Sequence, residues 1–254
     1  MKIISYNING VRAAIKKGFA DWLKSASPDV LCLQEIKALP ENLPENFFKD
    51  LGYAHEFWMP AEKKGYSGVG IFTKSKPDEI VYGCENECYD REGRFISAKF
   101  GDISILNVYL PSGSSGDVRQ DFKMEFLDFF FVYVNELRKK EPNLVICGDF
   151  NICHKPIDIH NPVSNKKSSG FLPEEREWLS KFIDSGFTDT FRHFNAEPHQ
   201  YTWWTYRLNA RDRNLGWRID YHFTTKNLDD RLKRSVILKE ARHSDHCPIL
   251  LEIV

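Results

Sequence analysis

Short runs rich in β-branched and other apolar residues recur along the chain, and several of them are apolar almost throughout. Strands that are buried on both faces show this unbroken pattern, whereas half-exposed strands alternate between apolar and polar positions. The pattern predicts strands at Ile3–Asn7, Val30–Gln34, Val69–Thr73, Phe95–Phe100, Ile103–Tyr109, Leu144–Cys147, Tyr221–Thr224 and Ile249–Ile253.

Two apolar stripes with helical spacing lie between the predicted strands. The first contains Phe122, Phe126, Phe129, Phe130, Tyr133 and Leu137. Basic residues at 138–140 and then Pro142 follow it, as at the carboxyl end of a helix. The second helix is predicted to begin at Pro173–Glu175, to end at Gly186 and to bury Trp178, Leu179, Phe182 and Ile183. Helical spacing accounts for both stripes, so we interpret them as core.

Strands and helices are mixed along the chain without a regular strand–helix–strand alternation. No low-complexity tract, no repeat of ~20–50 residues and no Pro/Gly-rich linker divides the sequence. We therefore predict a single α/β domain over residues 1–254. Its expected architecture is a four-layer α/β sandwich, in which two packed mixed β-sheets are flanked by helices.

Composition narrows the class of protein. The chain is 42% hydrophobic and 14% aromatic, which suits a packed core and excludes disorder. The 35 basic and 36 acidic side chains nearly cancel, so a nucleic-acid-binding face would have to be a local cluster. There is no leader pattern and no apolar run near the ~20 residues of a membrane helix, so we expect a cytoplasmic protein without a membrane partner. The six cysteines lack C-x-x-C spacing, which favours buried free thiols over a zinc site.

Polar residues with chemical potential gather where the predicted strands end, and loops at strand ends are where α/β proteins assemble their sites. The candidates are Asn7, Asn9, Glu35, Lys37, Tyr109, Asp149, Asn151, Asp220, Asp245 and His246. Carboxylate and amide oxygens dominate this set, and such hard donors suit Mg²⁺ or Mn²⁺ better than zinc. The sequence has neither a phosphate-binding G-x-x-x-x-G-K-[ST] loop nor a G-x-S-x-G elbow. Metal-assisted hydrolysis of a phosphate ester is the chemistry that remains.

Five motifs in order along the chain carry a more specific signal, and further stretches such as Gly170–Arg176 add to it. The five are Asn7–Ala13, Leu33–Glu35, Gly148–Asn151, Trp217–Tyr221 and Ser244–His246. This set resembles the exonuclease III/apurinic–apyrimidinic endonuclease family of the endonuclease/exonuclease/phosphatase superfamily, and the matches extend over the whole chain. The resemblance implies the four-layer sandwich. It also implies a monomeric, Mg²⁺-dependent phosphodiesterase (Mn²⁺ as a possible substitute) that cuts double-stranded DNA 5′ to abasic sites, with 3′→5′ exonuclease or 3′-end-cleaning activity.

The resemblance also assigns roles to the strand-end residues. It implies that Glu35 is the principal metal ligand, with Asp245 and Asn9 nearby, although some relatives carry Asp where Asn9 stands. Asp149 is implied to position or deprotonate the attacking water, and Asn151 to assist it. A free Asp has a pKa of ~3.9, so a base role would require an environment that raises it. His246, oriented and charged by Asp220, is implied to donate to a phosphate oxygen, and Tyr109 and Asn7 complete the catalytic set.

Substrate contacts follow from the same resemblance. Trp203, Trp217 and Ile219 are expected to form an apolar pocket for a flipped-out abasic sugar, and the alternative is that both tryptophans are simply core. DNA-backbone contacts are expected from Arg12, Lys37, Tyr82, Arg119, Asn161 and Asn165. The sequence departs from its relatives at Ser112–Ser115, at Ser168 in place of Asn, and at Arg207 in place of an apolar wedge. These departures concern the grip on DNA.

Two other functions remain open at this point. A phosphatase acting on inositol phosphates or sphingolipids would share Glu35, Asp149, Asn151 and the Asp245–His246 pair. It would not be expected to share Trp217–Tyr221 with Trp203–Trp204, nor the loop at Asn161–Gly170. A non-catalytic DNA- or protein-binding module would have no reason to retain acids at every catalytic position.

Overall fold

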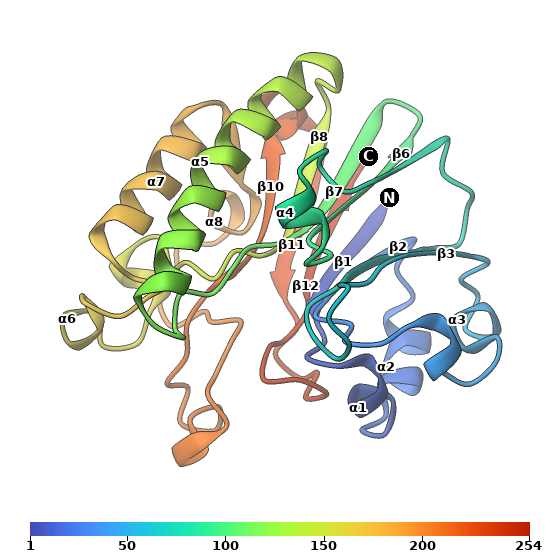
Figure 1. The fold of residues 1–254 in the computed structure, drawn as a ribbon, viewed down its shortest axis with the longest axis horizontal. Helices are drawn as coiled ribbons and strands as arrows, with labels where there is room; N and C mark the ends of the chain where they lie inside the picture. The colour runs from blue at the N-terminus through green and yellow to red at the C-terminus, as the bar shows by residue number, and fades with distance from the viewer.

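The computed structural model describes residues 1–254 and consists of two six-stranded sheets packed face to face, with helices on their outer sides (Figure 1). In spatial order the first sheet contains β11 (Leu232–Ile237), β12 (Ile249–Ile253), β1 (Lys2–Asn7), β2 (Val30–Gln34), β4 (Val69–Thr73) and β3 (His55–Met59). The second contains β5 (Glu79–Tyr82), β6 (Phe95–Phe100), β7 (Ile103–Tyr109), β8 (Leu144–Asp149), β10 (Asp220–Thr225) and β9 (Phe187–Asp189). Only the pairs β1–β2 and β7–β8 are parallel, so both sheets are mixed, as predicted.

The structure has eight α-helices. They are α1 (Val11–Ile15), α2 (Phe19–Ala26), α3 (Phe47–Asp50), α4 (Glu87–Asp90), α5 (Asp117–Lys140), α6 (Pro162–Asn165), α7 (Pro173–Asp184) and α8 (Thr190–Phe194). In Figure 1, α1 to α3 lie beside the first sheet, and the long α5 and α7 lie beside the second. None of the helices is both long and apolar enough to cross a membrane.

Three buried clusters correspond to the three interfaces of a four-layer sandwich. Between the sheets, Cys32 and Ile71 of the first pack with Ile105 and Cys147 of the second. A second cluster joins the first sheet to α1, α2 and α3, and a third joins the second sheet to α5 and α7. The predicted architecture is confirmed.

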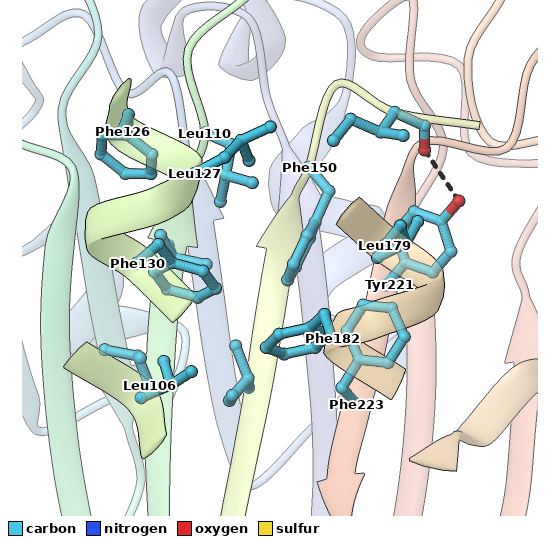
Figure 2. Close-up of a cluster of buried hydrophobic side chains, with 14 of the residues drawn as sticks. Leu106, Leu110, Phe126, Leu127, Phe130, Phe150, Leu179, Phe182, Tyr221 and Phe223 are labelled. Atoms are coloured by element: carbon cyan, nitrogen blue, oxygen red, sulfur yellow. Dashed lines mark hydrogen bonds between the residues drawn. The ribbon is translucent and has the colours of Figure 1, made fainter. Parts of the chain in front are cut away.

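The third cluster contains the predicted aromatic stripes. Figure 2 shows Phe126 and Phe130 of α5 and Phe182 of α7 directed at Phe150 and the strands beneath. Phe126, Phe130 and Phe182 are fully buried, whereas the remaining aromatics of the α5 stripe are only partly covered. Apolar burial of this kind stabilises by about 1.5–3 kcal/mol per large side chain. It fixes both helices on the sheet that carries Asp149.

Four strands were missed from the sequence, and all four are sheet edges: β3, β5, β9 and β11. Edge strands are short or carry charges, as in Leu-Lys-Arg-Ser-Val-Ile of β11, so they lack the unbroken apolar pattern. Two central strands also extend further than predicted: β8 continues to Asp149, and β10 begins already at Asp220. All six cysteines are free, and Cys88 alone is exposed.

Candidate active site

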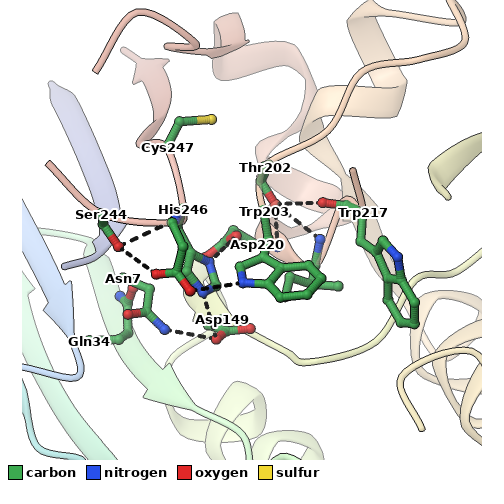
Figure 3. A network of polar contacts seen from close by, with 12 residues as sticks. Asn7, Gln34, Asp149, Thr202, Trp203, Trp217, Asp220, Ser244, His246 and Cys247 are labelled. Carbon is green, nitrogen blue, oxygen red and sulfur yellow. Dashed lines mark hydrogen bonds and ion pairs between the residues drawn. The ribbon is translucent and has the colours of Figure 1, made fainter. Parts of the chain in front are cut away.

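The carboxyl ends of the two parallel strand pairs meet at one edge of the sandwich. Asn7 is the last residue of β1, Tyr109 that of β7 and Asp149 that of β8, and Glu35 directly follows β2. The Asn7 amide donates to Glu35 Oε1 at 2.8 Å and to Asp149 Oδ2 at 2.9 Å (Figure 3 shows the second bond). Asn7 is fully buried. Because its amide bonds to a residue next to β2 and to a residue of β8, it connects the first sheet to the second at this edge.

His246 lies between two carboxylates of the second sheet. Asp220 and Asp149 are register partners on β10 and β8, so their side chains are close neighbours. His246 Nδ1 is 2.9 Å from Asp220 Oδ2, and its Nε2 is 3.8 Å from Asp149 Oδ2 (Figure 3). Burial lowers the pKa of His246, but Asp220 outweighs it, followed by Asp149 and Asp245, and the pKa rises to about 10. The imidazole is thus held charged at neutral pH.

Asp149 is buried, and its environment raises its pKa above that of a free carboxyl, which is too low for an efficient base at neutral pH. Burial raises the pKa of Asp149 to about 7, with His246 opposing and Asp220 and Glu35 adding to the rise. The Asn151 backbone N–H donates to Asp149 Oδ1 at 2.8 Å, and Asn151 occupies the left-handed region at φ 52°. The carboxyl is therefore oriented from the strand and from the turn that follows it.

Glu35 is the second fixed carboxylate of the site. Its backbone adopts φ 50°, and Lys37 Nζ lies 2.6 Å from its Oε2. Burial opposes ionisation, but Lys37 and the Asn7 amide outweigh it and lower the pKa of Glu35. Glu35 is thus a carboxylate at neutral pH, as a metal ligand must be.

The groups that could hold a metal ion differ in part from the predicted set. One ligand atom each of Glu35, Asp149 and His246 lies within 4.8 Å of the others. The predicted ligand Asp245 joins this group indirectly, because Asn9 Nδ2 donates to Asp245 Oδ1 at 2.8 Å while Asn9 Oδ1 accepts from Lys37. The charged His246 is unsuited to a cation, which leaves an oxygen donor set.

Tyr109 faces the same carboxylates. Burial raises the pKa of Tyr109 well above its usual value, and the charges of Glu35 and Asp149 add to the rise. The Arg94 guanidinium lies over the ring at 4.8 Å. The phenol therefore stays a neutral hydroxyl that can donate a hydrogen bond.

A cavity of about 740 Å³ opens over these groups. It is lined by Glu35, Tyr109, Asp149, Asn151, Asp245 and His246, by Trp203, Trp217 and Ile219, and by small residues of the segments 112–116 and 167–170. The two tryptophan rings meet edge to face at 5.9 Å, and Trp203 Nε1 donates to Asp245 Oδ2 at 3.1 Å. Both tryptophans are only half-buried, so they form a cavity wall, whereas the neighbouring Trp204 is core.

None of the predicted DNA-backbone contacts lines this cavity. Arg12 and Lys37 line an adjoining hollow of about 450 Å³. Tyr82 is 52% exposed on the edge strand β5. Arg119 is paired with Glu92, N to O 2.7 Å, so its charge is already largely compensated.

The remaining predicted contacts lie on two loops. Asn165 donates to the carbonyl of Asn161 at 3.0 Å within the α6 turn, and neither residue lines the cavity. Ser112 and Ser168, two of the departures, do line it. Arg207 is exposed at the tip of the loop beside Leu208.

Sequence reasoning missed two buried polar contacts, one behind the site and one between the sheets. Lys123 lies on the buried face of α5 and donates to the carbonyl of Asn151 at 2.8 Å. The sequence could have indicated this residue, because Lys123 lies three residues before Phe126 within a segment whose apolar stripe is predicted to be buried. Gln34 and Asn107 meet between the sheets, Nε2 to Oδ1 2.7 Å, and no sequence pattern marks that contact.

Comparisons with known proteins agree with this geometry. Residues 4–246 match the Endonuclease/Exonuclease/phosphatase family. A relative named DNA repair nuclease APEX1, from Danio rerio, is 43% identical over 99% of this chain and 81% of its own length. An exodeoxyribonuclease from Bacillus subtilis (strain 168) is 39% identical over 100% of this chain and 99% of the relative.

Solved structures agree with this assignment. The structure of an AP endonuclease from Archaeoglobus fulgidus superimposes with a TM-score of 0.88 at 31% identity, covering 100% of this chain and 99% of the other. Fold, site and sequence similarity all extend over nearly the whole chain. The protein therefore belongs to the endonuclease/exonuclease/phosphatase family and, within it, to the exonuclease III/apurinic–apyrimidinic endonuclease group of nucleases.

Proposed function

We propose that this protein is a Mg²⁺-dependent DNA-repair nuclease that hydrolyses double-stranded DNA 5′ to abasic sites and also trims 3′ ends. The observation that carries the proposal is the meeting of Glu35, Asp149 and His246 at the base of a cavity walled by Trp203 and Trp217. The names of the relatives, a DNA repair nuclease, an exodeoxyribonuclease and an AP endonuclease, support the same reaction class.

Asp149 activates the attacking water in this proposal. A carboxyl with a pKa raised to about 7 can accept a proton at neutral pH, which an ordinary Asp cannot do efficiently. The Asn7 amide and the Asn151 N–H hold its two oxygens. A water bound to Asp149 would therefore have a fixed direction of attack.

His246 and Tyr109 address the negative charge that develops during the reaction. The transition state of phosphodiester hydrolysis gathers charge on the phosphate oxygens, and preorganised donors stabilise it. His246 remains an imidazolium beside Asp220, and Tyr109 remains a neutral donor. Both line the cavity above Asp149, so both can reach a phosphate placed there.

The oxygen donor set fits a hard divalent cation. Glu35 is the anionic ligand, and the side-chain oxygens of Asn7, Asn9 and Asp245 lie in the same hydrogen-bonded group. When bound, Mg²⁺ supplies Lewis-acid stabilisation of phosphate and leaving-group charge. Carboxylate and amide oxygens without a thiolate favour Mg²⁺ or Mn²⁺ over zinc.

The aromatic wall provides the specificity for damage. Trp203 and Trp217 are backed by an apolar cluster of Cys153, Ile159, Phe171 and Ile219. An apolar wall suits a sugar that carries no base, and a site without a base also costs less to unstack and flip. We therefore propose that the abasic sugar packs against this wall while its 5′ phosphate lies over Asp149.

One experiment tests this function. A duplex with a single abasic analogue and an undamaged duplex with a recessed 3′ end are incubated with the protein, with and without Mg²⁺. We expect Mg²⁺-dependent incision at the abasic site, and loss of that incision by orders of magnitude in Glu35→Gln with DNA binding retained. Incision in excess chelator, or full activity of Glu35→Gln, would show that the proposed metal role is wrong. Release of inorganic phosphate from an inositol phosphate with both DNA substrates left intact would favour the phosphatase alternative.

A further inference from the structure

A buried ion pair lies outside the cavity, behind the turn that follows β8. The Lys123 ammonium on α5 and the Glu175 carboxylate on α7 are 2.6 Å apart, and neither side chain is exposed. Lys123 Nζ also donates to the backbone carbonyl of Asn151 at 2.8 Å. The proposed mechanism uses neither charge. Burying two charges is costly unless their hydrogen-bonding capacity is satisfied, so the pair requires a structural reason.

The carboxylate of the pair is bonded to the cavity wall. Glu175 Oε2 accepts the backbone N–H of Gly170 at 2.6 Å and that of Leu172 at 3.0 Å. Gly170 has φ 91°, and a Cβ at this position would lie 3.0 Å from both the Trp217 ring and the Asn151 carbonyl oxygen. The loop at Gly170 is therefore in close contact both with the aromatic wall at Trp217 and with the turn at Asn151 after β8, here called the catalytic turn.

The turn itself is held at three points. Asn151 is in the left-handed region, which Asn adopts more readily than most residues with a Cβ. Its backbone N–H donates to Asp149 Oδ1, and its side-chain amide donates to the Leu110 carbonyl at 2.9 Å. The carbonyl of Asn151 is bonded only through Lys123 among the side chains of the protein. Lys123 thus completes the set of contacts that keeps the Asp149 carboxylate in one orientation.

We propose that Lys123, balanced in charge by Glu175, is a positioning residue that couples the catalytic turn at Asn151 to the cavity wall at Gly170. Its consequence for cleavage rests on the proposed function. Helix capping alone does not account for the pair. Glu175, at the third position of α7, would accept the Leu172 N–H without any lysine, and the α5 position of Lys123 is otherwise suited to an apolar residue.

The test uses a double variant, Lys123→Met/Glu175→Gln, which removes both charges at similar volume and leaves no unpaired buried charge. The control is Lys99→Met/Glu141→Gln, a partly exposed ion pair of 2.8 Å between β6 and the residue after α5, near the ends of β7 and β8 that lie away from the site. We expect single-turnover incision of the abasic duplex to slow by about tenfold to a hundredfold, because a misplacement of ~1 Å can cost about a hundredfold. The Kd for that duplex and the rate of the control should be unchanged. Lys123→Arg, which retains the charge, should recover part of the rate.

A second readout needs no DNA. Hydrogen exchange of the Asn151 and Gly170 amides should be at least about tenfold faster in the double variant than in the wild type, with the core strands unaffected. Incision at the wild-type rate, an equal loss in the control, or unchanged exchange at both amides would overturn the proposal. If the wild type cleaves no abasic DNA, the proposed function fails, and exchange alone then decides the positioning role. Should the double variant not fold, Glu175→Asp, which keeps both charges but shortens the carboxylate, takes its place with the same expected direction.

Discussion

At the scale of single residues, the site separates two carboxyl groups by environment. Glu35 has a lowered pKa beside Lys37, whereas Asp149, deeper and next to Asp220, has a raised one. One group is therefore suited to hold a cation and the other to accept a proton. Such a divergence between neighbouring acids is the usual physical basis for assigning separate roles.

Replacement of Asp220 tests the charge of His246. Asp220→Asn keeps the shape but removes the main charge that raises the pKa of His246 to about 10, whereas the burial that lowers it remains. The pKa of His246 should fall in this variant, so its imidazolium should lose its proton at a lower pH than in the wild type. The loss of incision rate should therefore grow between about pH 6 and about pH 9. Measurement of pH–rate profiles checks this, and two profiles that superimpose after scaling would contradict it.

Replacement of Trp217 tests the pocket wall. An aromatic contact of this kind contributes about 1–3 kcal/mol, which corresponds to roughly tenfold to a hundredfold. Trp217→Ala should slow incision at abasic sites by about that factor, while trimming of an undamaged recessed 3′ end falls less.

The melting temperature of the same preparation provides the control for Trp217→Ala. A large fall in melting temperature with both activities lost together would indicate that Trp217 acts mainly as core. A stable variant with unaltered incision would place specificity elsewhere, in the segment around Ser112 or at Arg207.

At the scale of elements, a buried ion network holds the segment that carries the pocket wall. Arg218 is 1% exposed and lies 2.7 Å from both Asp158 and Asp189, and Arg192 is also 2.7 Å from Asp158. Arg218 stands between Trp217 and Ile219 in sequence. The network therefore fixes the beginning of β10 against β9 and the loop before α6.

The network predicts a pH-dependent contribution to stability. Burial opposes ionisation of Asp158, but Arg218 and Arg192 outweigh it, and the pKa of Asp158 falls to about 2. A depressed folded pKa contributes stability above the unfolded value of ~3.9, and this contribution is lost as the pH falls toward about 2. Asp158→Asn should lower the free energy of unfolding by about 3–5 kcal/mol at neutral pH, because Arg218 loses a buried partner.

Denaturant unfolding at neutral pH, at about pH 4 and at about pH 2.5 measures this effect, because the contribution begins to fall near the unfolded pKa of ~3.9 and continues to fall toward about 2. The difference between wild type and Asp158→Asn should narrow as the pH falls. The control is Asp212→Asn, whose ion pair with Arg242 is more than half exposed on both sides and should matter little. A difference that stays constant with pH would show that the charge of Asp158 is not what stabilises the network.

At the scale of the whole molecule, the nearly balanced charge of 35 basic and 36 acidic residues requires a local DNA-binding face. We propose the hollow beside the site as this face, because Arg12, Lys37, Lys63 and Lys64 line it against two glutamates. Binding through this face should weaken steeply with salt, since each phosphate contact contributes about 0.9 to the slope of log K against log salt.

Replacement of Arg12 or of Arg119 changes the net charge equally, so the two variants test whether DNA binding depends on the local charge at each position. Arg12→Ala should flatten the salt slope by about 0.9 for damaged and intact duplex alike. Arg119→Ala should flatten it less, because Glu92 already compensates this guanidinium. Titration of each variant with labelled duplex at several salt concentrations checks both. An unchanged slope for Arg12→Ala would remove Arg12 from the DNA contacts.

The sequence alone determined the fold class, the central strands, the two long helices and the identities of the strand-end residues. These follow from the local pattern of burial along the chain: β2 and β4 are buried throughout, and β1 and β7 at all but one position, because both faces of these strands are covered. The four edge strands were not predicted because each has a neighbouring strand on only one side. Their unpaired edge is open to solvent, so they need no uniform apolar pattern.

Only the tertiary structure decided how those residues act together. The sequence cannot state that Asn7 bridges Glu35 and Asp149, that Asp220 stands in register with Asp149, or that Lys123 reaches Asn151. These contacts join segments far apart in the chain, and their strength depends on the exclusion of water. Burial raises the pKa of Asp149, and this burial exists only once the two sheets have packed together, with Asn7 of the first sheet and Asp220 of the second beside the carboxyl. Side-chain identity is local information, whereas distance and dielectric environment are properties of the packed molecule.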